Sequence, residues 1–168
     1  PRIREIAELM PVAGEAEIGW RAVKDMSVEA AKLLEPAFEK YQGRNGRISV
    51  QTDPRLHRGK DALVAQAVEF DALAKNIIVK IPASKTGIEA MEEATYRGVS
   101  VNATVSFTVP QAVAVGEAIQ RGLLRRQAEG LDISTMGPVV TIMGGRLDDW
   151  LKKVVARDGI TIDPGYLE

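Results

Sequence analysis

Apolar residues gather in four short runs that begin near residues 47, 76, 99 and 138. Three longer segments, residues 61–74, 86–97 and 109–129, instead place their apolar side chains at helical spacing. The short runs are rich in valine and isoleucine, which favours strands. Strands that alternate with helices are typical of a parallel sheet built from βαβ units. The pattern therefore predicts an α/β protein.

Each of the four runs has an apolar face and a face that carries polar atoms, because side chains alternate along a strand. The apolar face collects Ile48, Val50, Ile77, Val79, Ile81, Val99, Val101, Ala103, Val105, Val140 and Ile142. The opposite face, called the polar face below, collects Ser49, Gln51, Ile78, Lys80, Pro82, Ser100, Asn102, Thr104, Val139, Thr141 and Met143. A sheet covered by helices on both sides is apolar on both. The polar face therefore predicts a site inside a barrel.

Lys80 is the most informative residue, because it stands inside the apolar run of residues 76–82. A buried ammonium costs several kcal/mol unless a partner offsets it. Burial without an anion favours the neutral amine, which attacks carbonyl carbons to form Schiff bases. The alternative is a lysine at a strand end whose amine reaches water.

The chain is expected to divide into an N-terminal helical segment and a part that carries the strands. Residues 1–46 have a helical pattern, in which Ser27 is expected to cap a helix that runs to Tyr41. Residues 47–168 carry the four strands, whereas a closed (β/α)₈ barrel needs eight strands and roughly 250 residues. We therefore expect a TIM-barrel type of fold of which this chain holds a part. An open sheet is the alternative, but it leaves the polar face unexplained.

Composition narrows the classes of partner. The net charge of −1 gives no general attraction to nucleic acid or to an anionic membrane. The absence of cysteine excludes disulfides and thiolate metal sites. No run of about 18 apolar residues and no signal-peptide pattern occurs, so a cytoplasmic protein without a membrane partner is expected. Assembly into a homo-oligomer stays open.

Four segments in order resemble the transaldolase family. They are Gly46-Arg47-Ile48-Ser49-Val50-Gln51-Thr52-Asp53-Pro54-Arg55-Leu56, then Val79-Lys80-Ile81-Pro82-Ala83-Ser84 with Thr86-Gly87-Ile88 and Ala90, then Gly98-Val99-Ser100-Val101-Asn102-Ala103-Thr104 with Phe107 and Gln111-Ala112, and Thr141-Ile142-Met143-Gly144-Gly145-Arg146-Leu147-Asp148-Asp149. The resemblance extends from about residue 41 to residue 152.

The resemblance implies a metal-free Schiff-base mechanism without an organic cofactor. Such enzymes move a dihydroxyacetone unit from a ketose phosphate to an aldose phosphate in the pentose phosphate pathway. Lys80 matches the nucleophile, whereas Asn102 and Thr104 match residues that position the sugar and a catalytic water. Thr141 stands where the family usually has serine. Arg146 matches an arginine that binds the substrate phosphate, which suits its planar guanidinium.

Two departures from the family pattern keep alternatives open. Gln51 stands where most transaldolases have a catalytic glutamate, and an amide cannot take up a proton at neutral pH. The related fructose-6-phosphate aldolases have glutamine there and cleave the ketose without obligatory transfer. Asn102, in contrast, follows the transaldolase pattern, and residues 1–46 hold no match for the strand that supplies the family's aspartate. An aldolase-like cleavage or a non-catalytic sugar-phosphate binder are therefore the alternatives.

Overall fold

The centre of the computed structural model, which describes residues 2–166, is a four-stranded parallel sheet. Its strands β1 (Ile48–Gln51), β2 (Ile77–Pro82), β3 (Val101–Ser106) and β4 (Val139–Ile142) lie side by side in chain order. All four begin within two residues of the predicted positions. Sequential order is that of a barrel wall, whereas a doubly wound sheet reverses its order partway. The predicted α/β fold and its part-barrel form are thus confirmed.

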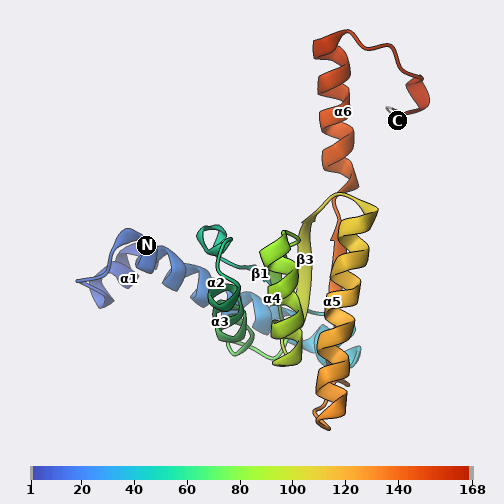
Figure 1. The fold of residues 1–168 in the computed structure, drawn as a ribbon. Coiled ribbons are helices and arrows are strands. Elements are labelled where there is room, and N and C mark those ends of the chain that lie inside the picture. The colour runs from blue at the N-terminus through green and yellow to red at the C-terminus, as the bar shows by residue number, and fades with distance from the viewer. Residues whose placement is uncertain (1, 167–168) are drawn as a thin grey trace.

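Three helices cover the apolar face of the sheet. After β1 comes the short 3₁₀ helix η1 (Pro54–Leu56), and then α3 (Lys60–Asp71), α4 (Lys85–Tyr96) and α5 (Val109–Ala128) pack next to one another (Figure 1). Val50, Val79, Ile81, Val101 and Ala103 are buried beneath them. This burial confirms the predicted orientation of β1, β2 and most of β3.

The N-terminal part consists of α1 (Arg2–Leu9) and α2 (Glu15–Lys40). The prediction that Ser27 caps a helix was wrong, because α2 runs through this residue without a break. The Ser27 hydroxyl donates to Val23 O at 2.7 Å, so it is satisfied within the helix. The division of the chain into residues 1–46 and 47–168 stays a prediction.

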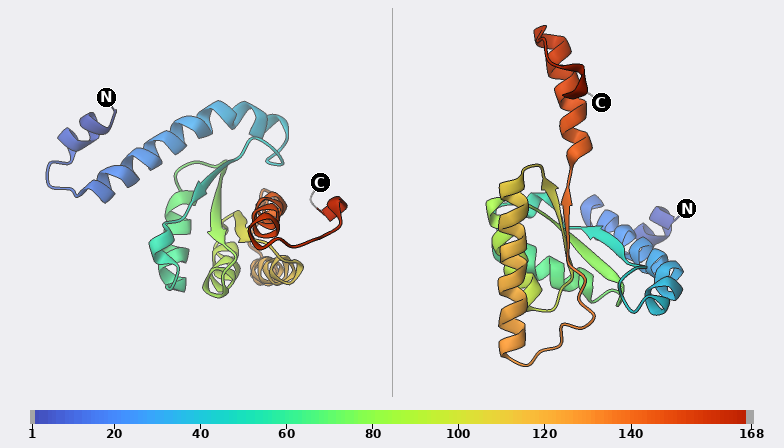
Figure 2. Two further views of the ribbon diagram at one scale, coloured as in Figure 1. Left: turned by 90° about the horizontal axis from the view of Figure 1, so that it is seen from above. Right: turned by 90° about the vertical axis from the view of Figure 1, so that its right-hand side faces the viewer.

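Helix α2 lies along the β1 edge of the sheet. Its side chains Val23, Met26 and Ala30 come next to Ile48 of β1. The Trp20 ring packs on Phe70 of α3 with 5.8 Å between centroids. In Figure 2 the strands lie between α2 on one side and α4 and α5 on the other, and the left view shows α2 lengthwise. Helix α2 therefore continues the layer of α3, α4 and α5 around the β1 edge of the sheet.

The end of β3 departs from the predicted alternation. Val105 was expected on the helix-covered face, but it is 45% exposed and its backbone has a φ of +54°. The pairing of β3 with β4 shifts between Ala103 and Ser106, which is the mark of a β-bulge. The extra residue of the bulge turns Val105 out of the regular pleat.

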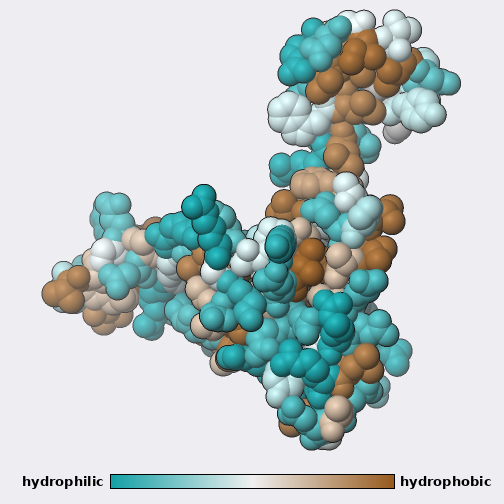
Figure 3. All heavy atoms as spheres, viewed as in Figure 1, coloured by the Kyte–Doolittle hydropathy of each residue, from teal (hydrophilic) through white to brown (hydrophobic). Residues whose placement is uncertain are grey.

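The apolar face of β4 is only partly covered, by contacts with α5. Val140 is 37% exposed and Ile142 is 53% exposed, although both were expected beneath a helix. The reason is that α6 (Gly144–Asp158) projects away from the sheet instead of folding back over β4 (Figure 1). Hydrophobic side chains gather on the projecting helix, as Figure 3 shows, and η2 (Pro164–Tyr166) follows it. Within residues 2–166, every helix is too short or too polar to span a lipid bilayer.

Candidate active site

Three of the predicted site residues form one row across the polar face. In the strand register Gln51 of β1 is paired with Lys80 of β2, and Lys80 is paired with Asn102 of β3. Paired residues of parallel strands point to the same side of the sheet. Strand parity alone therefore predicted correctly that these side chains share one face of the sheet.

Lys80 lies in the middle of this row, two residues before the end of β2. Its neighbours Val79 and Ile81 are completely buried under the helices, so the Lys80 side chain extends from the opposite face, where it is half-buried. Ion pairs of lysines within residues 2–166 involve Lys24, Lys32, Lys60 and Lys75. Lys80 has no such pair in this part of the chain, which leaves its amine available for a ligand.

The peptide carbonyl of Lys80 is held by three donors from the β1 side. The Thr52 amide and the Thr52 hydroxyl each donate to Lys80 O at 3.1 Å, and Gln51 Nε2 donates to it at 3.2 Å. A carboxylate at position 51 has no hydrogen to donate and could not make the last bond. Gln51 is therefore bound to the strand that carries the lysine, and its Oε1 remains as an acceptor.

The Asn102 side chain on β3 bonds to side chains of both β1 and β4. Its Nδ2 donates to Ser49 Oγ of β1 at 3.1 Å, and its Oδ1 accepts from Thr141 Oγ1 of β4 at 2.9 Å. The bond to Ser49 passes over β2, so the sheet must curve toward the polar face, as the wall of a barrel does. This network fixes the Asn102 amide beside Lys80.

The other two predicted residues lie outside this network. Thr104 stands two residues beyond Asn102 on β3, paired with Pro82, and is only 4% exposed. Its hydroxyl lies 3.9 Å from Met143 Sδ, which is a weak contact. Arg146 is exposed in the first turn of α6, just past the end of β4. The structure thus brings Gln51, Lys80, Asn102 and Thr141 together and leaves Arg146 at the rim.

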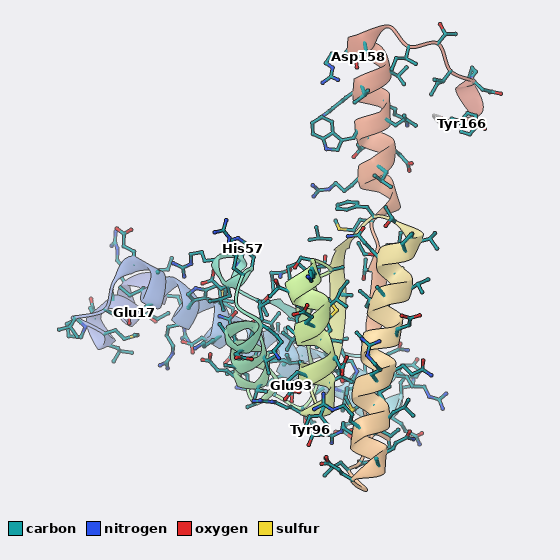
Figure 4. The ribbon with its side chains drawn as sticks, in the orientation of Figure 1. Glu17, His57, Glu93, Tyr96, Asp158 and Tyr166 are labelled. Atoms are coloured by element: carbon teal, nitrogen blue, oxygen red, sulfur yellow. The ribbon has the colours of Figure 1, made fainter. Side chains whose placement is uncertain are left out.

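Charged groups near the end of β1 stabilise the loop that follows the row. Arg55 contacts the Asp53 carboxylate through Nε at 2.9 Å and Nη2 at 2.5 Å, and these bonds hold the pKa of Asp53 at about 2. The Asp53 amide donates to Gln66 Oε1 at 2.6 Å. His57, the only histidine of the chain, is exposed beyond η1 (Figure 4). These groups shape the loop and do not face Lys80.

Sequence reasoning gave no role to Ser49 and Thr52, although both help to fix the site. Ser49 was on the predicted polar face, so parity was a signal for it. Thr52 follows the last residue of β1 and is buried. Its double contact with Lys80 O depends on the register of β1 and β2, which the sequence pattern does not define.

Comparison with known proteins finds relatives over most of the chain. The sequence profile of the transaldolase/fructose-6-phosphate aldolase family matches residues 3–165. Transaldolase 1 of Streptomyces avermitilis is 36% identical over 132 residues, which are 77% of this chain and 35% of that protein. The transaldolase of Thermobifida fusca is 35% identical over 130 residues, 76% of this chain and 35% of that protein.

The transaldolase of Mycobacterium leprae, strain TN, is 32% identical over 158 residues, which are 92% of this chain and 42% of that protein. The chain therefore spans about a third to two fifths of the length of these curated relatives. The matched region includes all four strands and every residue of the row described above. On this evidence the chain belongs to the transaldolase/fructose-6-phosphate aldolase family.

Proposed function

We propose that Lys80 forms a Schiff base with a ketose phosphate and that the chain carries out transaldolase-type transfer of a dihydroxyacetone unit to an aldose phosphate. The observation that supports this most is the position of Lys80. A half-buried amine without an ion pair to residues 2–166 stands between Gln51 and Asn102 on the polar face. Family membership agrees with sugar phosphates as the substrate class.

The proposed reaction needs no redox partner. The neutral Lys80 amine adds to the ketose carbonyl, and loss of water gives an iminium ion. The carbon–carbon bond between the third and fourth carbons then breaks, the hydroxyl of the fourth carbon gives its proton to a water molecule, and the aldehyde product leaves. The electron pair of the broken bond is held as an enamine. The enamine carbon attacks the carbonyl of the acceptor aldose, whose oxygen takes up a proton from water. Hydrolysis of the new iminium ion releases the product ketose and frees Lys80.

The residues around Lys80 suit the binding of a polyhydroxylated substrate. Asn102 uses one amide hydrogen on Ser49, and its second amide hydrogen can be donated to a sugar hydroxyl. Thr141 donates its proton to Asn102, so its oxygen can accept from the substrate. Thr104, farther along β3, is proposed to orient a water. These three side chains therefore position the sugar, whereas Lys80 makes the covalent bond.

Arg146 is proposed to bind the substrate phosphate. It lies in the first turn of α6, where backbone N–H groups and the helix dipole favour an anion. Its guanidinium is exposed and is therefore free to meet a ligand at the rim. A planar guanidinium can bind phosphate through two parallel hydrogen bonds.

Gln51 supports a second candidate, simple aldol cleavage without an acceptor. Its Nε2 donates to Lys80 O at 3.2 Å and to Thr52 O at 3.4 Å, so Oε1 remains to hold a water, and it cannot exchange a proton with that water. Without this proton transfer, transfer to an aldose has no obvious advantage over cleavage. The two reactions share the Schiff base on Lys80 and differ in the fate of the enamine.

Trapping with borohydride tests the proposal. The protein is incubated with fructose 6-phosphate and sodium borohydride, and its intact mass is measured beside that of Lys80→Met. We expect one covalent dihydroxyacetone adduct on the wild type and none on the variant. Adding erythrose 4-phosphate should deplete the adduct if transfer occurs and should leave it unchanged if only cleavage occurs. Sugar-phosphate binding without any adduct would indicate a non-catalytic binder.

A further inference from the structure

We propose that Gln111 is a positioning residue that holds the ends of β2 and β3 together beside Lys80. The inference rests on the proposed function for its catalytic consequence, but its structural basis is independent. Gln111 is a half-buried residue in the first turn of α5. Its side-chain amide contacts three separate pieces of backbone at the carboxyl ends of β2 and β3.

The first contacts are those of a helix cap. Gln111 Oε1 accepts from the amides of Phe107 at 3.0 Å and Thr108 at 3.2 Å, while the Gln111 amide donates to Thr108 Oγ1 at 3.3 Å. This arrangement is a capping box, and it needs only an acceptor at the end of the side chain. Capping therefore explains the contacts of Gln111 Oε1 but not those of Nε2.

The other half donates to the two strands. Gln111 Nε2 donates to Ala83 O at 3.1 Å, just past the end of β2, and to Val105 O at 3.4 Å near the end of β3. The Ala83 amide in turn donates to Thr104 O at 2.7 Å. Gln111 thus joins the carbonyl just past the end of β2 to the carbonyl of Val105, which lies where the pairing of β3 with β4 shifts at the bulge.

The bulge is a strained place that needs such support. Val105 has a φ of +54°, in the left-handed region that a β-branched residue rarely adopts. A carbonyl left without a donor there would add to the strain, and the chain could relax by straightening the bulge. Thr104 precedes Val105, and Ala83 comes three residues after Lys80. Relaxation would therefore move Thr104 relative to Lys80.

Gln111→Glu separates the two roles. Glutamate at this position keeps the acceptor of a capping box, but it cannot donate to Ala83 O or Val105 O. Gln120→Glu is the matched control, because Gln120 is exposed on the same helix and the change of charge is identical. If Gln111 only caps α5, its glutamate variant should behave as the control does.

The first readout is the rate of borohydride trapping at saturating and at limiting fructose 6-phosphate. We expect Gln111→Glu to lower the maximal trapping rate tenfold or more, with little change in the half-saturating concentration, because the substrate contacts remain. Gln120→Glu should trap at the wild-type rate. A folded Gln111→Glu protein that also traps at the wild-type rate would overturn the proposal.

The second readout needs no substrate and separates this inference from the proposed function. Hydrogen exchange should become faster in the peptides that contain Ala83 and Val105 in Gln111→Glu, but not in Gln120→Glu. Replacing Val105 by glycine, which tolerates a positive φ, should reverse at least half of that increase. If the wild type traps no sugar, the proposed function fails. Equal exchange in the two glutamate variants would overturn the positioning role in either case.

Discussion

Replacing Gly87 by alanine tests how closely α4 approaches the strand that carries Lys80. A Cβ at Gly87 would lie 1.8 Å from Pro82 O and 3.1 Å from Ser84 Oγ. An ordinary contact of a Cβ atom is 3.4–4 Å, so β2 or α4 must move by roughly 1.6 Å. Overpacking of this kind typically costs about 1–3 kcal/mol, and a clash with backbone belongs at the upper end. The helix propensity of alanine returns about 1 kcal/mol at most.

The assay is urea unfolding followed by circular dichroism, with Gly116→Ala as the control. Gly116 lies within α5, and a Cβ there would meet nothing within 4 Å. The control should therefore gain about 0.5–1 kcal/mol. We expect Gly87→Ala to lose about 2 kcal/mol, which corresponds to about 1 M in the urea midpoint for a slope of about 2 kcal/mol per molar. Equal gains in both variants would refute the close approach of α4 to Pro82.

Three further predictions concern residues around the row. Gln51→Glu removes the donor to Lys80 O and supplies a proton acceptor, so transfer to erythrose 4-phosphate should increase relative to cleavage by about 10²-fold or more. An unchanged ratio would show that residue 51 does not set the reaction type. Arg146→Ala should raise KM for phosphorylated sugars tenfold or more, since such a contact contributes about 1.5–3 kcal/mol. Equal effects on unphosphorylated sugars would reject the phosphate role. The folded-state pKa of Asp53 lies at about 2, below its unfolded value, so its ion pair with Arg55 stabilises the fold above about pH 4, and this contribution disappears as the pH falls through about 2. Asp53→Asn should therefore lower the urea midpoint at pH 6 but not at pH 2, and only modestly, because Arg55 is 66% exposed. An equal loss at both pH values would contradict this assignment.

Strand parity predicted much of the site, because its period of two is a local property of the chain. The shared face of Lys80, Gln51 and Asn102 followed from alternation, whereas their alignment in one row follows from the register of the strands. The bonds of Ser49 and Thr52 could not be predicted in this way. They depend on the curvature and register of the sheet, which arise from packing between segments far apart in the chain.

The wrong predictions also have identifiable physical causes. Ser27 looked like a helix cap, but a serine inside a helix can bond to the carbonyl four residues earlier. Val105 follows the strand pattern in sequence, but the pairing of β3 with β4 shifts there and leaves it exposed with a positive φ. Ile142 was expected beneath a helix because it is apolar, but it is exposed because α6 projects away from the sheet. Such outcomes depend on tertiary contacts that no local pattern contains.

The central claim, that Lys80 is the Schiff-base nucleophile, is tested most directly by locating the trapped sugar. The borohydride-reduced adduct with fructose 6-phosphate is digested, and the modified lysine is identified by fragment mass spectrometry. Lys85 serves as the internal control, because it is exposed in the first turn of α4 only five residues away. We predict modification of Lys80 alone. Modification of Lys85 instead, or of many lysines to similar extents, would contradict the assignment.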